Sequence, residues 1–328
     1  MADAAPPLRA IDLNVDCGES FGVWTLGEDA LVLRHVTSAN IACGGHAGDP
    51  LVMRRTLRLC RELGVSAGAH PGYPDVQGFG RRALPMSPEE IAAHTLAQLG
   101  ALDALARAEG VSLTHVKPHG ALYNQAAARR DVADALAWAV AAFDRRLILV
   151  GLAGSHLIEA GRAAGLPVAR EAFVDRAYEA DGSLRARHLP GALIASIARS
   201  VEQALSIALR GEVVAHDGTR VSAQADTLCI HGDAPDAPAR AEQVRRALEQ
   251  AGVAVRFAGA STSSAAGAST RPLPELVEGN GFASTASTGS ASTGSAAGAS
   301  TGSAAGASTR PLPELAEGNG GSGVNAHG

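Results

Sequence analysis

A single lysine stands out among the positively charged residues of this chain. Lysine and arginine together number 28, and Lys117 is the only lysine. Its neighbours at period two are His115 and His119, and alternate residues of a strand face the same side. An ammonium is a compact group that can titrate when buried, whereas the guanidinium of arginine is planar and always charged. Lys117 is therefore our first candidate for a catalytic residue, against the alternative of a surface lysine present by chance.

Polar side chains also accompany the first two predicted strands. Asp12, Asn14 and Asp16 alternate with apolar residues, so all three face the same side of one strand. After the second strand, a glycine-rich turn carries His46 and leads to Asp49 at the start of a predicted helix. Because backbone N–H groups at a helix start can bind an anion, we expect this turn to bind a carboxylate, phosphate or oxyanion.

The other predicted strands end in further ionisable groups. In β/α barrels, catalytic residues collect at the C-terminal ends of the strands. Seven of the eleven Phe, Trp and Tyr residues lie in or beside these segments, which is typical of a pocket lining. The additional candidates for the site are Glu19, His70, Arg81, Arg82, Tyr123, Asn124, Asp175, Arg176, His231 and Asp233.

Several candidates have a structural alternative. A lone histidine is more often buried against backbone than catalytic, but four at strand ends favour a site. These four are His46, His70, His119 and His231. Asp12 begins its strand and can equally anchor a barrel floor. Cys43 resembles an activated nucleophile at a helix start, although a small buried thiol is commoner. Arg81 and Arg82 follow a glycine loop, and they either lie on the surface in contact with solvent or together bind an anion.

Strand and helix patterns alternate along most of the chain. Helix signals are clearest at Asp49-Pro50, with Gly64 after the end, and at Ser87, which opens a capping box. Asp217-Gly218 between two apolar runs predicts a hairpin. Repeated βα units predict an α/β fold with a parallel sheet. Because no Gly-x-Gly-x-x-Gly follows the first strand to mark a dinucleotide-binding fold, we favour a TIM-like (β/α) barrel, complete or missing one strand. The predicted strands cover residues 11–15, 36–42, 65–69, 113–116, 147–152, 168–173 and 227–230.

Composition divides the chain into three parts. We expect residues 1–10 to form an N-terminal extension and residues 11–258 to form the barrel domain. Residues 259–328 are rich in Ala, Ser, Thr and Gly, and residues 268–281 recur almost unchanged at 307–320. Such a segment buries too little apolar surface to offset the entropy lost on ordering, so a disordered, low-complexity tail with one duplicated segment is predicted.

Charge and composition argue against several classes of partner. The net charge of -5 and the pI near 6.1 leave no basic stripe for nucleic acid. No apolar run approaches the roughly 20 residues that span a bilayer, and the first residues do not read as a signal peptide, so we expect a cytoplasmic protein without a membrane partner. The four cysteines lack CxxC spacing, which predicts reduced thiols.

Seven segments of the chain together resemble the LamB/YcsF family, which includes the A subunit of prokaryotic 5-oxoprolinase. The resemblance covers residues 11 to about 257. It implies a seven-stranded barrel of the glycoside-hydrolase/deacetylase type and a hydrolase that opens the cyclic amide of 5-oxo-L-proline to L-glutamate. It also implies ATP as co-substrate and a complex with subunits B and C. The segments are residues 12–22, 40–50, 68–75, 78–82, 117–124, 171–178 and 231–233.

The chemistry of a lactam agrees with these residues. A five-membered lactam is a stabilised amide, and phosphorylation by ATP is one route to activating its carbonyl oxygen. Since the chain has no Gly-x-x-x-x-Gly-Lys-Ser/Thr loop, we expect partner subunits to supply much of the activation, and whether ATP contacts this chain stays open. Asp16 or Asp175 would act as general base, and His70 or His119 as proton donor.

The remaining roles in this hypothesis concern charge. Lys117 and the turn from Cys43 to Asp49 would stabilise developing negative charge, and Arg81 or Arg82 would hold the substrate carboxylate.

Two other functions fit the same sequence. A metal-dependent amidohydrolase or deacetylase would act alone, without ATP, and would hold zinc, manganese or a similar divalent cation on nitrogen and oxygen ligands. Its ligand set would be Asp16, His46, His70 and His119. A non-catalytic, lactam-binding subunit would only position its partners, although the clustered proton-transfer residues argue against it.

Overall fold

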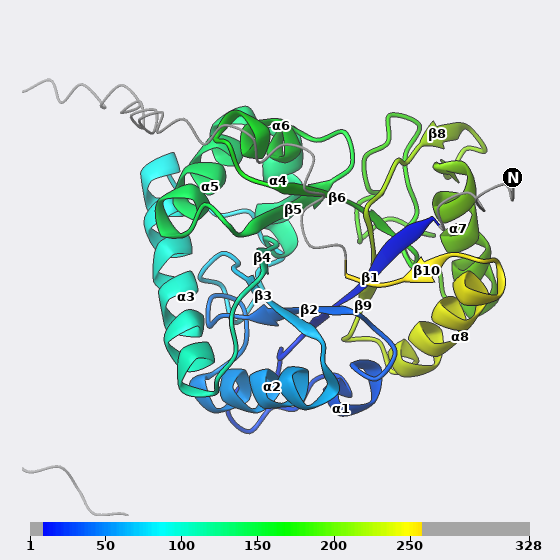
Figure 1. Ribbon diagram of the computed structural model, residues 1–328. Helices are drawn as coiled ribbons and strands as arrows, with labels where there is room; N and C mark the ends of the chain where they lie inside the picture. The colour runs from blue at the N-terminus through cyan, green and yellow to red at the C-terminus, as the bar shows by residue number, and fades with distance from the viewer. Residues whose placement is uncertain (1–8, 258–328) are drawn as a thin grey trace, which may run out of the picture. The chain divides into compact units, whose positions relative to one another are not determined.

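A closed barrel of seven parallel strands forms the part of the protein that the structure describes, residues 9–257 of the computed structural model. The strands follow one another around the barrel in chain order, and β9 closes it by pairing with both β6 and β1. Figure 1 shows the helices outside the strands. The barrel strands are β1 (Ala10–Cys17), β2 (Ser38–Ala42), β3 (Ser66–His70), β4 (His115–Val116), β5 (Ile148–Leu152), β6 (Val168–Phe173) and β9 (Thr227–His231).

This architecture confirms the TIM-like α/β barrel, in the form that lacks one strand. All seven predicted strands are present, with ends displaced by up to two residues. The two-stranded hairpin is also confirmed, as β7 (Glu212–Val214) and β8 (Arg220–Ser222). A further two-residue strand, β10 (Ala254–Val255), pairs with the start of β1 and was not predicted. The predicted tail, residues 259–328, and most of the N-terminal extension lie outside the described residues.

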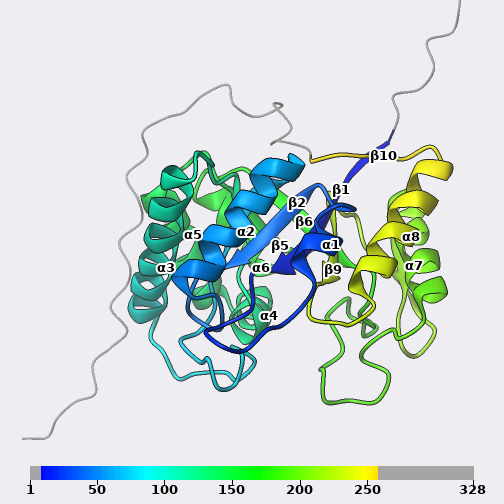
Figure 2. The same ribbon diagram turned by 90° about the horizontal axis from the view of Figure 1, so that it is seen from below.

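Eight helices are described, and the two with the clearest sequence signals begin where those signals lie. Asp49 caps α2 through the N–H groups of Leu51 and Val52, and Gly64 ends it in the left-handed conformation. Ser87 and Glu90 form the reciprocal capping box of α3. The helices are α1 (Asp29–Val32), α2 (Pro50–Leu63), α3 (Pro88–Ala108), α4 (Gly120–Ala128), α5 (Arg130–Phe143), α6 (His156–Ala163), α7 (Ile197–Arg210) and α8 (Ala237–Gln250). In Figure 2, α7 and α8 lie side by side, and α8 also contacts β9 and β10.

Strand β1 separates the apolar core from a polar barrel interior. Leu13 and Val15 are fully buried in the apolar core, and burying each side chain contributes about 1.5–3 kcal/mol. Asp12 faces the other side and accepts hydrogen bonds from the hydroxyls of Thr37, Ser38 and Thr227 at 2.6–2.7 Å. Burial raises its pKa. These contacts support the structural alternative for Asp12, which ties three strands together at the N-terminal end of the barrel.

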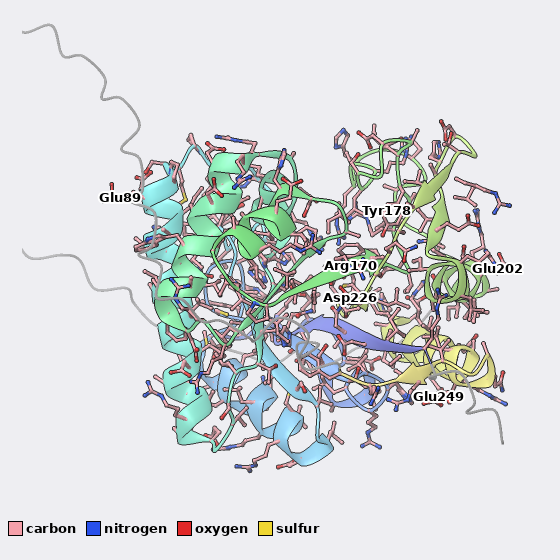
Figure 3. All side chains as sticks on the ribbon, turned by 45° about the horizontal axis from the view of Figure 1, so that its top comes forward. Glu89, Arg170, Tyr178, Glu202, Asp226 and Glu249 are labelled. Atoms are coloured by element: carbon pink, nitrogen blue, oxygen red, sulfur yellow. The ribbon has the colours of Figure 1, made fainter. Side chains whose placement is uncertain are left out.

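A second polar contact lies at the same end. Arg170 of β6 and Asp226, just before β9, lie next to each other in Figure 3. The guanidinium donates to both carboxylate oxygens at 2.7 and 2.9 Å. Because both side chains are more than a third exposed, this pair is expected to contribute little to stability. No helix in the described part of the chain is long and apolar enough to cross a membrane.

Glu109, at the end of α3, links two of the outer helices. It accepts hydrogen bonds from Arg54 and Arg58 of α2 at 2.6–3.0 Å, and these lower its pKa from 4.5 to about 2, with Arg58 the larger cause. A carboxylate whose pKa is lowered by folding stabilises the protein above its unfolded pKa and loses that effect as the pH falls. We therefore expect Glu109→Gln to lower the melting temperature at pH 7, and the difference from wild type to disappear between about pH 4.5 and pH 2.

The matched control is Glu249→Gln, since Glu249 forms an exposed pair with Arg245 within α8. This variant should melt close to wild type at every pH. Equal melting of wild type and Glu109→Gln at pH 7 would contradict the role given to Glu109.

Candidate functional site

A pocket lies at the C-terminal end of the barrel, and the structure brings most of the sequence candidates to it. Strands β1, β3, β6 and β9 and the segments that follow β3, β4 and β6 all contribute lining residues. This is the end at which barrels of this type carry their chemistry. The candidates that line the pocket are Asp16, His70, Arg81, Lys117, His119, Tyr123, Asn124, Arg176 and His231.

Lys117 lies at the floor of this pocket, directly after β4. Its side chain is 2% exposed, and its ammonium is 2.8 Å from both Asp16 Oδ1 and Glu171 Oε1. Burial alone would lower the pKa of Lys117, but Asp16, Cys229 and Glu171 hold it well above its usual value. Burial would raise the pKa of Asp16, but its neighbours His70 and Lys117 outweigh burial and hold that pKa well below its usual value. Lys117 is therefore a fixed positive charge and not a proton acceptor.

Two asparagines fix the carboxylates beside this lysine. Asn14 donates to Glu171 Oε1 at 3.0 Å, and Asn40 donates to Asp16 Oδ1 at 2.8 Å. Asn14 was predicted to contact substrate, but it does not line this pocket, and its amide donates to Glu171 and Thr227. Glu171 and Asn40 were not predicted as site residues. The signal for Glu171 was available, because it alternates with Phe173 and Asp175 along β6 and the residues after it.

Three histidines form a buried cluster beside Asp16. His70 Nε2 lies 3.0 Å from His119 Nδ1 and 3.4 Å from Asp16 Oδ2. His46 stacks on His119 with ring centroids 3.6 Å apart, and its Nε2 is 3.2 Å from Glu19 Oε1. Burial lowers the pKa values of His46 and His119 well below the usual range, so both imidazoles are neutral.

The same cluster contains the atoms best placed to hold a cation. Ligand atoms of Glu19, His46, His70 and His119 all lie within 4.8 Å of one another. Glu19 thus joins the histidines in this group, and Asp16 Oδ2 lies 3.4 Å from His70 Nε2. Imidazole and carboxylate ligands together suit zinc and the neighbouring divalent metals.

The backbone around Phe79 is shaped to support this cluster. Its carbonyl lies 2.9 Å from His119 Nε2, and it has a φ of 54°, the only positive value at a non-glycine among the described residues. Such a conformation costs about 1–3 kcal/mol and is typical of functional sites. At neighbouring Gly80, a Cβ would lie 2.7 Å from His46 Cβ and 2.9 Å from His119 Cδ2. The loop therefore approaches the rings as closely as glycine allows.

Asp175 and His231 form a second hydrogen-bonded pair at the pocket wall. His231 Nδ1 is 2.9 Å from Asp175 Oδ1, and the backbone N–H of His231 donates to Asp175 Oδ2 at 3.0 Å. Although burial opposes it, the contacts with His231 lower the pKa of Asp175 to about 2. His231 lines the pocket, whereas Asp175 lies behind it. Asp175 is therefore placed to orient the imidazole and not to touch a substrate.

Three arginines line the pocket, Arg81 from the segment after β3 and Arg176 and Arg187 from the loop after β6. Arg81 pairs with Asp233, which holds it at the pocket edge. Burial and the charge of Arg187 lower the pKa of Arg176 to about 10, and its Nε has no hydrogen-bond partner among the described atoms. Burial and the charge of Arg81 lower the pKa of Arg187. Arg187 was not predicted, because no motif marks the long loop after β6. Guanidinium groups that repel one another in a partly buried pocket favour binding of an anion.

Three predicted features lie outside the pocket. Asp49 fills the start of α2 with its own carboxylate and also accepts from Gly22 N–H, so that turn is not free to bind an anion. Arg82 pairs with Asp75, and its side chain is 62% exposed. Burial raises the pKa of the Cys43 thiol to about 12, which supports the alternative of a small buried thiol. All four cysteines are free and buried.

Comparisons with known proteins point in one direction. The LamB/YcsF family model matches residues 11–263. A protein of Chloroflexus aggregans named as the A subunit of 5-oxoprolinase is 64% identical over 249 residues, which cover 76% of this chain and 99% of the relative. A protein of Methylococcus capsulatus with the same name is 56% identical over 258 residues, which cover 79% of this chain and 99% of the relative. The crystal structure of a lactam utilization protein from Thermus thermophilus is 50% identical, with a TM-score of 0.71, and covers 75% of this chain and 99% of that chain.

Proposed function

This chain belongs to the LamB/YcsF family, and we propose that it is the lactam-opening subunit of an ATP-dependent 5-oxoprolinase. The relatives are named as subunits, which implies a complex of several chains. In the proposed reaction, 5-oxo-L-proline and water give L-glutamate, while ATP is hydrolysed to ADP and phosphate. Subunits B and C are the proposed partners.

The observation that carries the proposal is the combination of charges in one small pocket. Arg81, Arg176 and Arg187 suit the carboxylate of 5-oxoproline, or the carboxylate and phosphate of a phosphorylated lactam. Asp16 and Lys117 lie at the floor of the same pocket, and His231 lines the wall. A pocket that offers cations for an anionic substrate and an imidazole for proton transfer fits the hydrolysis of an acidic lactam.

The sequence supports a division of labour between subunits. The Walker loop that cradles ATP phosphates requires Gly-Lys, and the only lysine, Lys117, follows Val116. We therefore assign activation of the lactam oxygen by ATP to the partner subunits. This barrel then receives the lactam or its phosphorylated form and completes ring opening.

Proton transfer in this step falls to His231. Its imidazole takes a proton from the attacking water and returns it to the ring nitrogen as the C–N bond breaks. Starting from the phosphorylated lactam, this step leaves the phosphoryl group on the new carboxyl oxygen, and a second water then releases it as phosphate. Asp175 orients His231, and Lys117 fixes the Asp16 carboxylate beside the reacting carbonyl. Of the two aspartates expected from sequence to act as base, Asp16 reaches the pocket, but its strongly lowered pKa makes it a weak base.

Glutamate release from 5-oxoproline tests the proposal. The full chain alone, subunits B and C alone, and all three together are each incubated with 5-oxoproline, with and without ATP. We expect glutamate only from the complete mixture with ATP, in proportion to ADP formed. Release of glutamate by this chain alone without ATP would replace the proposal with an independent amidohydrolase, and equal release without this chain would remove it from the reaction.

A further inference from the structure

The hydrogen bonds of His70 and His119 fix which ring nitrogen of each carries the proton. His70 Nδ1 lies 2.7 Å from the carbonyl oxygen of Lys117, and His119 Nε2 lies 2.9 Å from that of Phe79. A carbonyl oxygen only accepts hydrogen bonds, so each of these nitrogens carries the hydrogen. In a neutral imidazole the other nitrogen then has a lone pair. Those other nitrogens are His70 Nε2 and His119 Nδ1.

These two nitrogens face each other, and carboxylates surround them. His70 Nε2 and His119 Nδ1 are 3.0 Å apart, although neither has a hydrogen to donate. Glu19 Oε1 is 3.5 Å from His119 Nδ1, and Asp16 Oδ2 is 3.4 Å from His70 Nε2. Four electron-pair donors therefore lie in a row, each 3.0–3.5 Å from the next. Such an arrangement is unfavourable in a buried site unless a proton or a metal ion binds there.

We propose that His70 Nε2, His119 Nδ1 and Glu19 bind a divalent first-row transition-metal ion, with Asp16 Oδ2 as the fourth protein ligand. The separations of 3.0 Å between the two nitrogens and of 3.4 and 3.5 Å between each nitrogen and its neighbouring carboxylate oxygen are close to the roughly 3.3–3.6 Å between two ligands of a tetrahedral ion with metal–ligand bonds of 2.0–2.2 Å. Two imidazoles and two carboxylates suit zinc, manganese or iron. The other ring nitrogen of each of these histidines donates its hydrogen to a backbone carbonyl, as is usual for metal-binding histidines.

His46 has a different part in this site. Its ring is parallel to that of His119, at an angle of 3°, so the in-plane lone pairs of the two rings do not converge on one ion. Its Nε2 instead lies 3.2 Å from Glu19 Oε1 and can donate to it, which orients the carboxylate. We therefore assign His46 as a positioning residue for Glu19. This separates it from the ligand set expected from the sequence.

The ion would lie at the pocket floor, since Asp16, His70 and His119 all line the pocket. The contacts among these side chains support the metal site independently of the reaction proposed above. A binding experiment without substrate or partner subunits therefore tests it separately from the proposed function.

The test is a titration of the untagged, full-length chain, stripped of metal with a chelator, with Zn²⁺ by calorimetry and with Co²⁺ by visible absorption. We expect one equivalent of Zn²⁺ per chain and the d–d bands of Co²⁺ bound to nitrogen and oxygen. His46→Asn should weaken Zn²⁺ binding by about 10- to 100-fold, as removal of a partner outside the ligand set does. Glu19→Gln and His119→Gln should weaken it further.

The matched control is His156→Gln, because His156 is an exposed histidine that pairs with Glu159 on α6. It should bind Zn²⁺ like wild type, and circular dichroism should show that each variant is folded. Absence of stoichiometric binding by the wild-type chain would overturn the proposal without any variant. Binding that survives in folded His119→Gln but is lost in His156→Gln would overturn it as well.

Nitrogen-15 NMR of the histidine rings distinguishes a metal ion from a shared proton. In the metal-free chain we expect neutral rings with hydrogen on His70 Nδ1 and His119 Nε2, and Zn²⁺ should shift the two opposite nitrogens. An imidazolium that persists in the presence of Zn²⁺ would show that a proton holds the two rings together, and the metal site would be wrong.

Discussion

Lys117→Met is expected to lower the turnover of the assembled complex by a factor of about 100 to 1000, the range found when one preorganised electrostatic contact is removed from an active site, because Asp16 then loses the cation that fixes it. Methionine preserves much of the side-chain volume but leaves Asp16 and Glu171 without the ammonium that lies 2.8 Å from each. Breaking a buried ion pair by removing one partner costs about 3–5 kcal/mol. We therefore expect a lower free energy of unfolding in urea together with slower glutamate release.

A double variant separates stability from catalysis. Glu171→Gln removes one buried carboxylate, so Lys117→Met with Glu171→Gln should regain part of the lost free energy of unfolding. Turnover should stay low, because the positive charge is still absent. Recovery of turnover together with stability would show that Lys117 serves only the fold. Arg245→Met is a matched control, since it removes a cation from an exposed helical pair and should change neither measurement.

The pH dependence of this stability difference follows from the two pKa shifts. Lys117 has a raised pKa, so its contribution is complete below the unfolded value of 10.5 and is lost only as the pH rises through the folded value. Asp16 has a lowered pKa, so its contribution is present above 3.8 and is lost as the pH falls through the folded value. The difference between wild type and Lys117→Met should therefore be nearly constant between about pH 5 and pH 10.

The fold was predictable because each long element carries a local signal. Alternation of polar and apolar residues marked β1, and the cap residues of α2 and α3 marked their first turns. The strand β10 was missed, because two residues carry no periodicity and its place is set by pairing with Ala10 and Ile11. Closure of the barrel likewise depends on pairing of β1 with β9, which are more than 200 residues apart.

The site was predictable as a group of residues but not as a set of contacts. The parallel strands place Asp16, His70 and Lys117 at one end of the barrel, as their positions in the sequence indicated. Which carboxylate meets which cation depends on side-chain reach across the barrel. For that reason, Glu171 was missed as a partner of Lys117. Asp49 was expected in the site, but its carboxylate caps α2 instead.

His231→Gln is expected to lower kcat of the complex by about 1000-fold, within the range of 10² to 10⁴ for a positioned general acid–base group. KM for 5-oxoproline should change little, because the pocket arginines remain. Asp175→Asn should lower kcat by a similar order, since an amide no longer stabilises the charged imidazole or holds its proton on Nδ1. Glutamate release under saturating ATP measures both variants.

The double variant tests whether the two residues act as one unit. If Asp175 acts only through His231, the double variant should be no slower than His231→Gln alone, because residues that act together are not additive. Asp226→Asn is the matched control, because Asp226 is also an aspartate in contact with a basic side chain, Arg170, but lies at the opposite end of the barrel. This variant should leave kcat unchanged. If the fold-losses in kcat from Asp175→Asn and His231→Gln multiply in the double variant, Asp175 has a separate role. The assignment of His231 as the proton-transfer group oriented by Asp175 would then be wrong.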